Sequence, residues 1–271
     1  MWEVLLPIFG LLVGIAASLV GIGGGAFIVP ILTIIYALET PAATGTSLTV
    51  IIFTAIVSTI SYARKKRTYY KTGLILVVTT APGAFLGAMI AKRLAPNLLG
   101  FIFGFFLILV AFRTVSDMNS LNRKNLRDQR NSEQLRTVSD DEILKSRRTI
   151  AVGTGLSFFG GLASGLLGIG GGVLIVPIMT LAMNMPIHAA TATSMFTMIF
   201  TSMAGVPEYY VAGLVNPEFA ALLALGSIFG AQVGVYASSR VSGKNLRRSF
   251  AVIVLVVSIL MLNKYKSVLG F

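Results

Sequence analysis

A glycine-rich segment occurs twice in this chain, 147 residues apart, and it limits the folds open to the chain more than any other feature. Residues 21–31 read GIGGGAFIVPI, and residues 168–178 read GIGGGVLIVPI. The same offset aligns residues 14–54 with residues 161–201 at 21 identities in 41 positions. Two ordered motifs at one offset indicate a duplicated structural unit rather than shared low complexity.

The duplication extends beyond these motifs and divides the chain into parts. With a gap, residues 83–88 align with residues 226–231, and this alignment pairs Met89 with Gln232. Between the two halves lies a segment that is rich in charges of both signs. We predict three parts: a first repeat at 1–115, a charged linker at 116–147 and a second repeat at 148–271.

The composition places both halves in a membrane. Soluble domains carry about 25% charged residues, whereas this chain of 271 residues carries 12%, with 55% hydrophobic residues. The runs 101–112 and 250–262 are apolar on every face, as a helix in lipid must be. We therefore predict an all-α polytopic membrane protein with no sizeable soluble domain. The chain has no Cys, which excludes disulfides and Cys-ligated metal sites.

The net charge of +12 indicates orientation rather than a nucleic-acid partner, because no basic face interleaved with aromatic residues occurs. Five basic residues lie between 64 and 71, whereas the equivalent turn of the second half, 207–216, has none. The positive-inside rule places these turns on opposite sides of the membrane, so the repeats are predicted to be inverted. The N-terminus is then outside, the linker is cytoplasmic, and 18 of the 22 basic residues are inside, with Lys92 and Arg93 as exceptions.

Each half contains one helix that is too short to cross. Residues 26–38 are helical in character but span about 20 Å, less than the ~30 Å apolar core of a bilayer. With residues 3–20 they predict a helical hairpin whose glycine tip lies within the membrane, and 149–167 with 172–184 predict a second one. Irregular backbone at that depth has to be buried in protein or line a wet cavity. The predicted full crossings are 42–62, 73–91, 98–115, 188–206, 217–239 and 249–263.

The two glycine tips are the candidate substrate site. Consecutive glycines before a helix allow several backbone N–H groups to converge on an anion, and hydroxyl clusters begin the helices that follow. The alternatives are that the glycines serve close helix packing and that the hydroxyls bond to their own helices. The candidate residues are Gly21, Gly23, Gly24, Gly25, Thr44, Thr46, Ser47, Gly168, Gly170, Gly171, Gly172, Thr191, Thr193, Ser194 and the uncharged donor Gln232.

Other kinds of site are not supported by the sequence. No carboxylate, Lys or Arg lies well inside a predicted crossing, where proton-driven carriers generally place one. No metal-ligand spacing, nucleophile-base pair or phosphate-binding loop occurs. The single histidine, His188, lies at a predicted helix start and is interpreted as an interfacial side chain, with a proton relay as the less favoured alternative. We expect no cofactor, no metal and no enzymatic activity.

At the level of these motifs the chain resembles the TauE/SafE sulfite exporter family of membrane permeases. The resemblance rests on the doubled GIGGG-x-x-x-VP motif, each copy followed by an Ala-Ala-Thr-x-Thr-Ser helix start, and it covers nearly the whole chain. It implies transport of sulfite, organosulfonates such as sulfoacetate, or other small sulfur-containing anions or organic acids, with residues 21–25 and 168–172 near the substrate. A small-anion channel and, less favoured, an intramembrane lipid-phosphate enzyme remain the alternatives. The expected partners are a small anion and the lipid bilayer of the cell membrane, with no nucleic acid, and a homo-oligomer is compatible with the sequence.

Overall fold

The computed structural model describes residues 2–128, 140, 147–238 and 243–265, and it is all-α in this part of the chain, as predicted. Short 3₁₀ and π turns, Trp2–Leu5, Ile31–Ile35 and Ile178–Ala182, flank the helices. The helices are α1 (Leu6–Val20), α2 (Gly25–Pro30), α3 (Thr40–Arg64), α4 (Tyr70–Ala91), α5 (Pro96–Asp128), α7 (Arg147–Leu167), α8 (Gly172–Pro177), α9 (Ile187–Val211), α10 (Pro217–Ala237) and α11 (Gly243–Lys264).

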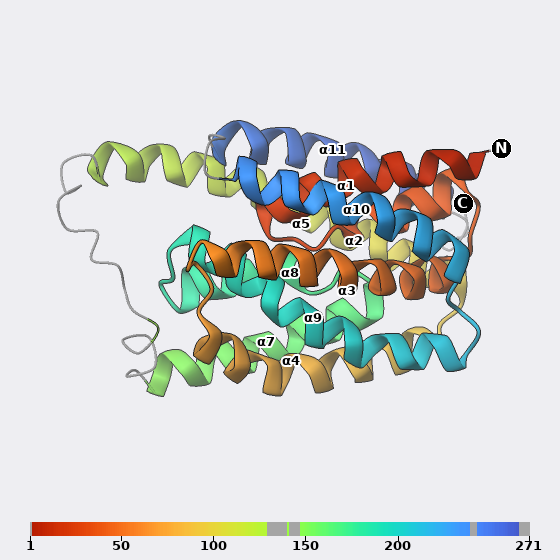
Figure 1. Cartoon of the computed structure of the whole chain (residues 1–271), viewed down its shortest axis with the longest axis horizontal. Helices are drawn as coiled ribbons and strands as arrows, with labels where there is room; N and C mark the ends of the chain where they lie inside the picture. The colour runs from red at the N-terminus through yellow and green to blue at the C-terminus, as the bar shows by residue number, and fades with distance from the viewer. Residues whose placement is uncertain (1, 129–139, 141–146, 239–242, 266–271) are drawn as a thin grey trace.

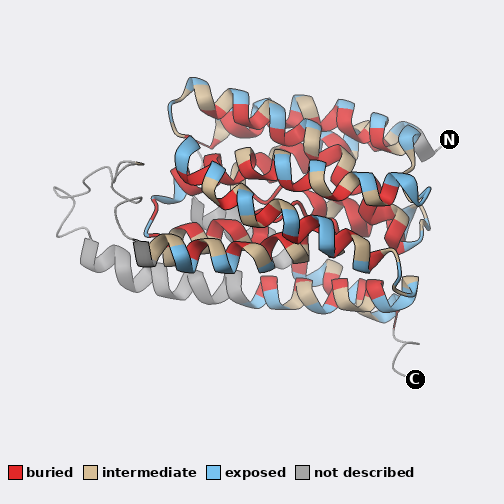
Figure 2. Ribbon diagram, turned by 90° about the horizontal axis from the view of Figure 1, so that it is seen from below, coloured by how far each residue is buried: buried red, intermediate tan, exposed pale blue. Residues whose placement is uncertain are grey.

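The helices form a bundle in which most close pairs join one half of the chain to the other (Figure 1). Helix α1 packs along α10, α7 along α4 and α5 along α11, while α3 and α9 cross in the middle. Buried residues face the interior and exposed residues the outside of the bundle (Figure 2). The outward side chains are largely apolar, for example Val78 and Phe229, which are 71% and 62% exposed. Apolar side chains on the outer surface are what lipid contact requires.

Glycine allows the pairs α1–α10 and α4–α7 to approach at backbone distance. A Cβ at Gly83 on α4 would lie 2.4 Å from the carbonyl oxygen of Phe158. A Cβ at Gly230 on α10 would lie 2.1 Å from the carbonyl oxygen of Leu11. Both the glycines and their partners are 147 residues apart, so the two halves align without a gap through these helices.

This contact register corrects the gapped alignment of 83–88 with 226–231. The gap paired Gln232 with Met89, but the ungapped offset makes Phe85 its counterpart. Phe85 and Gln232 are both exposed on the outer surface of the bundle. The gapped alignment was attractive because small residues recur every four positions on both helices, and only the interhelical contacts distinguish the registers.

We expect Gly226→Ala to destabilise the protein, because its Cβ would lie 1.9 Å from the carbonyl oxygen of Pro7 on α1. Overpacking of this kind costs about 1–3 kcal/mol. Gly155→Ala is the matched control, since a Cβ at Gly155 has nothing within 4 Å and alanine raises helix propensity by about 1 kcal/mol. Thermal unfolding in detergent should show a lower Tm for the first variant only; equal Tm values would contradict the packing role.

Five helices of the described part are long and apolar enough to cross a membrane: Thr40–Arg64, Tyr70–Ala91, Thr149–Leu167, Ile187–Val211 and Pro217–Ala237. Four of them coincide with predicted crossings. Thr149–Leu167, predicted as a hairpin arm, is itself long enough to span. The predicted crossings 98–115 and 249–263 correspond, within the described residues, to the shorter apolar stretches Pro96–Phe112 and Val254–Lys264. Helix α5 continues to Asp128, well past the boundary predicted at 115.

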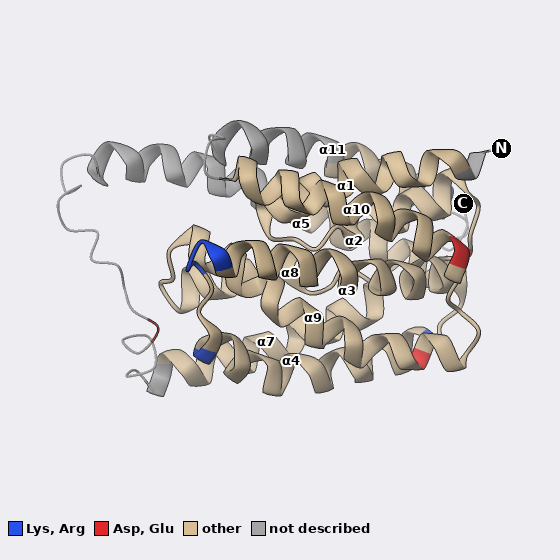
Figure 3. Cartoon of the chain, viewed as in Figure 1, with Lys and Arg blue, Asp and Glu red and all other residues tan. Residues whose placement is uncertain are grey.

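Charged residues of the described part lie at the two ends of the bundle (Figure 3). Lys and Arg gather where α3 ends and α4 begins, and the opposite end carries Glu39, Glu208 and Glu218. Lys92, an exception to the charge distribution, forms an ion pair with Glu208 on α9. The apolar middle and charged ends are those of a multi-pass membrane protein. Which end faces the cytoplasm stays a prediction from the charges.

Each glycine tip is the point at which the chain folds back. Tyr36, after the first short helix, lies edge-on to Phe219 in the first turn of α10, at a centroid distance of 5.3 Å. Helix α1 begins beside the same end of α10, so the chain enters and leaves at one end. In the second half, Met183, which follows the second short helix, lies beside the start of α7: a Cβ at Gly153 would lie 2.9 Å from its Sδ. Both segments therefore enter the bundle, turn at their glycines and return.

Each returning helix widens into a π turn directly after a proline, Pro30 or Pro177. Proline has no N–H to donate, so the carbonyl four residues earlier, of Ala26 or Val173, loses its helical donor; a threonine hydroxyl in each π turn bonds to the carbonyl just before the proline. The hydroxyl of Thr33 donates to the carbonyl of Val29 at 2.9 Å, and that of Thr180 donates to the carbonyl of Val176 at 3.0 Å. These two bonds are again related by the offset of 147.

Candidate functional site

The two glycine tips contact each other in the interior of the bundle. A Cβ at Gly25 would lie 2.1 Å from the carbonyl oxygen of Gly168, and one at Gly172 would lie 2.3 Å from the carbonyl oxygen of Gly21. All residues of both tips, 21–25 and 168–172, are buried. The structure thus brings together the two segments that the sequence placed at one site.

Helices α3 and α9, which cross in the middle of the bundle, are the two central helices. A serine from each of them binds the tip of the opposite half. The Ser47 hydroxyl on α3 donates to the carbonyl of Gly168 at 2.8 Å, and the Ser194 hydroxyl on α9 donates to the carbonyl of Gly21 at 2.9 Å. Ser194 also bonds back to Thr191 of its own helix. Both serines are fully buried, so each bond satisfies a carbonyl that the break in the helix leaves without a helical partner.

The threonines of the two clusters occupy different places. Thr44 and Thr191 pack against the tips: their Cγ2 atoms would lie 2.7 Å and 2.8 Å from a Cβ at Gly168 and at Gly21, respectively. The Thr44 hydroxyl is buried without a hydrogen-bond partner in the described part. A buried, unpaired donor beside the tip contact is a group that a bound anion could satisfy.

Thr46 and Thr193 serve the connections between helices rather than the tips. The Thr46 hydroxyl accepts from the backbone N–H of Asn216 at 3.0 Å, and the Thr193 hydroxyl accepts from the backbone N–H of Tyr69 at 2.9 Å. Each acceptor lies at the start of a central helix and each donor at the residue before α10 or α4. Thr46 and Thr193 therefore bind the residues that precede α10 and α4. Each lies one residue before a serine that binds a tip.

In the described part of the chain, the backbone N–H groups of the last three residues of each glycine tip have no hydrogen-bond acceptor. At the first tip, Gly21 and Ile22 donate to Ala17, and the next backbone N–H that donates is that of Phe27, in the helix after the tip. No hydrogen bond is made by the N–H groups of Gly23–Gly25 or of the equivalent residues 170–172. Over 90% of buried backbone N–H groups in proteins are paired. The first N–H groups of a helix lack helical acceptors, and here the two helix starts place such donors around one buried contact.

The backbone conformation at the tips requires glycine. Gly24 and Gly171 precede the two returning helices with φ of 89° and 86°, in the region that L side chains rarely adopt. A Cβ at Gly24 would in addition lie 2.7 Å from Cγ1 of Val13. This conformation turns the chain sharply into α2 and α8 at their N-caps.

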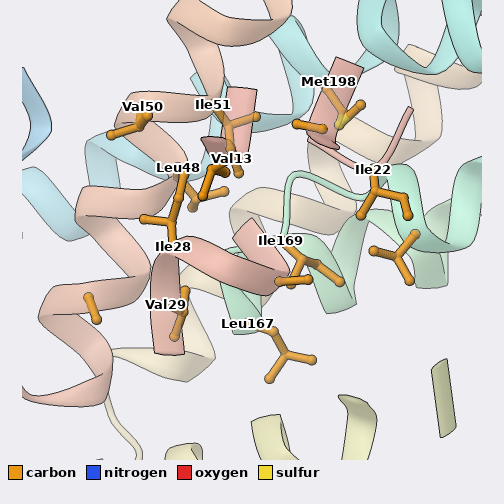
Figure 4. Packing of buried hydrophobic residues seen from close by; sticks show 14 of the residues in the cluster. Val13, Ile22, Ile28, Val29, Leu48, Val50, Ile51, Leu167, Ile169 and Met198 are labelled. Carbon is orange, nitrogen blue, oxygen red and sulfur yellow. The ribbon is translucent and has the colours of Figure 1, made fainter. Parts of the chain in front are cut away.

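Two apolar side chains cover the tips at the crossing of α3 and α9. A Cβ at Gly23 would lie 2.5 Å from Sδ of Met198, and one at Gly170 would lie 2.9 Å from Cγ2 of Ile51. Figure 4 shows both side chains, with those of Ile22 and Ile169, among the buried residues of this region. Ile51 and Met198 are fully buried and are equivalent at the offset of 147. We call these two side chains the central apolar pair.

Sequence reasoning did not identify the central apolar pair. Ile51 and Met198 lie on α3 and α9 in series with the hydroxyl residues, at helical spacing from Ser47 and Ser194. That spacing is the signal that could have placed them beside the tips. An apolar residue at such a position is ordinarily assigned to the core, and the contact with the tips is visible only in three dimensions.

Gln232 is not brought to the tips. It is exposed on the outer surface of α10, next to Val233, which is 53% exposed, whereas the tips are buried. Within the described residues, no group of three or more His, Cys, Asp or Glu side chains could hold a metal ion. The tip site consists of backbone donors, hydroxyls and apolar side chains.

We expect Ser47→Ala and Ser194→Ala to weaken the two halves' contact similarly, since each removes one bond to an opposite tip carbonyl. The loss of a buried hydrogen bond costs about 1–3 kcal/mol when the partner stays unsatisfied. Thermal unfolding of each variant measures the loss, with Thr154→Ala as the control because Thr154 bonds only to its own helix. Tm values equal to that of the control would show that these bonds do not hold the tips.

A family model and two relatives match this chain over nearly its full length. Residues 6–261 match the family model described as Sulfite exporter TauE/SafE. The "Probable membrane transporter protein YunE" of Bacillus subtilis is 34% identical over 265 residues, covering 94% of this chain and 95% of the relative. A "Probable membrane transporter protein" of Methanocaldococcus jannaschii is 30% identical over 273 residues, covering 95% and 94%. No solved structure matches the chain.

Proposed function

This chain belongs to the TauE/SafE sulfite exporter family of membrane transporters, and we propose that it carries small sulfur-containing or organic anions across the cell membrane. The substrate we favour is sulfite or an organosulfonate such as sulfoacetate, moved by export. The anion binds where the glycine tips of the two halves meet. In this proposal the linker end of the bundle faces the cytoplasm and the two halves are inserted in opposite directions.

The observation that carries this proposal is the set of unpaired N–H groups at residues 23–25 and 170–172. Each buried N–H without a partner is costly, and an oxyanion supplies several acceptor oxygens at once. The Thr44 hydroxyl adds a further unpaired donor. Neutral donors suit a transported anion, because the site must release what it binds and a buried Arg would hold a small oxyanion more tightly.

The tip contact is buried in this structure, which favours a carrier over a channel. The tips are buried, and the central apolar pair lies on them. An anion reaches the N–H groups only after these side chains or the tips move. A site that has to rearrange for each passage produces saturable transport, whereas an open channel does not.

Flux into proteoliposomes tests the proposal. The purified protein should move labelled sulfite or sulfoacetate with saturable kinetics and should be accelerated by unlabelled substrate on the opposite side. Large single-channel currents would instead identify an anion channel, and no flux with any of a panel of sulfur oxyanions would overturn the substrate class. Thermal shift with sulfite, sulfate, thiosulfate, sulfoacetate and carboxylates provides an independent ranking, since a ligand at 100 times its Kd stabilises by about 2.7 kcal/mol.

A further inference from the structure

The second half caps helix α10 with its own side chain, and the first half cannot do the same for α4. The Asn216 side chain accepts from the backbone N–H of Phe219 at 3.1 Å, as an N-cap residue does. The equivalent residue before α4 is Tyr69, which makes no side-chain cap. A phenol oxygen lies too far from its own backbone to reach the first turn. Helix α4 therefore needs its cap from elsewhere.

Asp140, a residue of the linker, occupies that place. Its Oδ2 accepts from the backbone N–H of Lys71 at 3.0 Å, and its Oδ1 accepts from the backbone N–H of Thr72 at 3.1 Å and from the Thr72 hydroxyl. Thr72 is the counterpart of Phe219 at the offset of 147, so the two capping bonds are equivalent. Lys71 and Thr72 are the second and third residues of α4, the positions that an N-cap side chain normally reaches.

The surroundings favour a carboxylate at this position. The end of the bundle that carries Asp140 holds Arg64, Lys65, Lys66 and Arg67 in the preceding turn and Lys71 on α4 itself. The positive end of the α4 dipole adds to this field. Burial raises the pKa of the Tyr69 phenol, and the negative charge of Asp140 raises it further.

The capped first turn of α4 is connected to a glycine tip through two hydrogen bonds made by neighbouring residues of α9. Tyr69, immediately before the capped turn, donates its backbone N–H to Thr193 at 2.9 Å. The next residue on α9, Ser194, holds the carbonyl of Gly21. The second half has the equivalent series of contacts. Asn216 donates its backbone N–H to Thr46, and the next residue, Ser47, donates to the carbonyl of Gly168. The two series differ in the residue that caps the helix. Asn216, which caps α10, belongs to the transmembrane half itself, whereas Asp140, which caps α4, belongs to the linker.

We propose that the start of α4 is a docking site for the linker and that Asp140 is a positioning residue which completes the first half by capping α4 in place of a local side chain. Helices α4 and α7 pack in parallel, as contacts of Gly161 with Thr80 and of Gly165 with Ala84 show. The start of α7 therefore lies at the same end as the start of α4, within reach of a linker residue shortly before Arg147. The linker thereby acts as part of the transporter at its charged end rather than as a tether only.

The linker also becomes a point at which the two glycine tips can be controlled separately. Undocking Asp140 loosens the start of α4, and with it the Tyr69–Thr193 bond beside the Ser194 contact. The Asn216 series of the other half is unaffected. This last step depends on the proposed function of the tips; the docking itself does not.

Hydrogen exchange of the full-length protein in detergent tests the docking. Asp140→Ala should speed exchange of the Lys71 and Thr72 amides by about fivefold, the factor expected for a lost N-cap. Asp140→Asn should restore slow exchange at Thr72, because asparagine caps as well as aspartate, but not at Lys71, since the amide of asparagine has only one oxygen that can accept. Asp141→Ala removes the same charge at the next position and should leave these amides unchanged. Unchanged exchange in Asp140→Ala, or equal acceleration by Asp141→Ala, would overturn the docking.

Transport assays on the same variants test its consequence. Flux of sulfite in proteoliposomes should change in Asp140→Ala and return in Asp140→Asn. Asn216→Ala, which removes the equivalent cap of α10, should speed exchange at Phe219 without affecting Lys71 and Thr72. Faster exchange with wild-type flux would keep the docking and reject its link to the tips. A wild-type protein without any anion flux would contradict the proposed function while leaving the exchange result valid.

Discussion

Transport should fall to background when Gly25 or Gly172 is replaced by alanine. Each substitution places a Cβ within 2.1–2.3 Å of a tip carbonyl of the opposite half, at Gly168 or Gly21. Neither glycine has a positive φ, so alanine introduces no backbone strain and acts through the opposite tip and, at Gly172, also through Cε of Met198 at 2.8 Å. The tips have to separate by the width of a methyl group, and this displaces the N–H groups that we propose for the anion.

Gly10→Ala is the control that separates transport from stability. A Cβ at Gly10 would lie 2.2 Å from the carbonyl oxygen of Leu223, which is an equally close backbone approach between α1 and α10 away from the tips. All three variants should lose about 1–3 kcal/mol through overpacking. Flux per folded molecule, measured in proteoliposomes after selecting monodisperse protein, should be lost only in the tip variants. Equal specific flux in all three would show that the glycines serve packing alone.

Much of the tip arrangement could be predicted from the sequence, because a duplicated motif indicates which segments of the two halves lie close together. Residues such as Ser47 and Ser194 recur at one offset next to two glycine breaks, and a two-fold relation between halves then brings each serine to the opposite tip. The antiparallel crossing of α3 and α9 follows the same relation, with Gly45 against Tyr209 and Gly205 against Leu48. Repeated motifs of this kind indicate contacts that a single copy would not.

The parts that could not be predicted depend on side-chain direction and on contacts between distant segments. Gln232 is polar in an apolar helix, and its polarity suggested an inward position, but it lies on the exposed face of α10. Thr46 and Thr193 look like tip donors in sequence and instead accept from the connections before α10 and α4. The role of Asp140 depends on a contact with α4 made across 68 positions of the chain, which no periodicity in the sequence indicates.

Replacing Met198 by alanine should open a leak for small anions. The Met198 side chain touches both tips, since a Cβ would lie 2.5 Å from its Sδ at Gly23 and 3.2 Å at Gly170. With Ile51 it excludes water from the donors, as an apolar constriction does in channels. Removing it lowers the barrier to anion entry, and a barrier lower by about 1.4 kcal/mol gives a tenfold faster leak. Ile51→Ala should act in the same direction, because Ile51 is its equivalent in the first half.

Two controls keep this prediction specific to the tips. Met198→Leu conserves volume and should keep wild-type leak and flux, because such swaps usually cost less than about 1.5 kcal/mol. Leu76→Ala truncates a fully buried side chain of α4 in a separate apolar cluster and should lower the Tm by a similar amount without a leak. Leak is measured as substrate-independent anion efflux from loaded proteoliposomes. A leak in Leu76→Ala equal to that in Met198→Ala would assign the effect to general loosening. No leak in either would show that the central apolar pair only fills space, and the barrier to anion passage would then have to be made by the tips themselves.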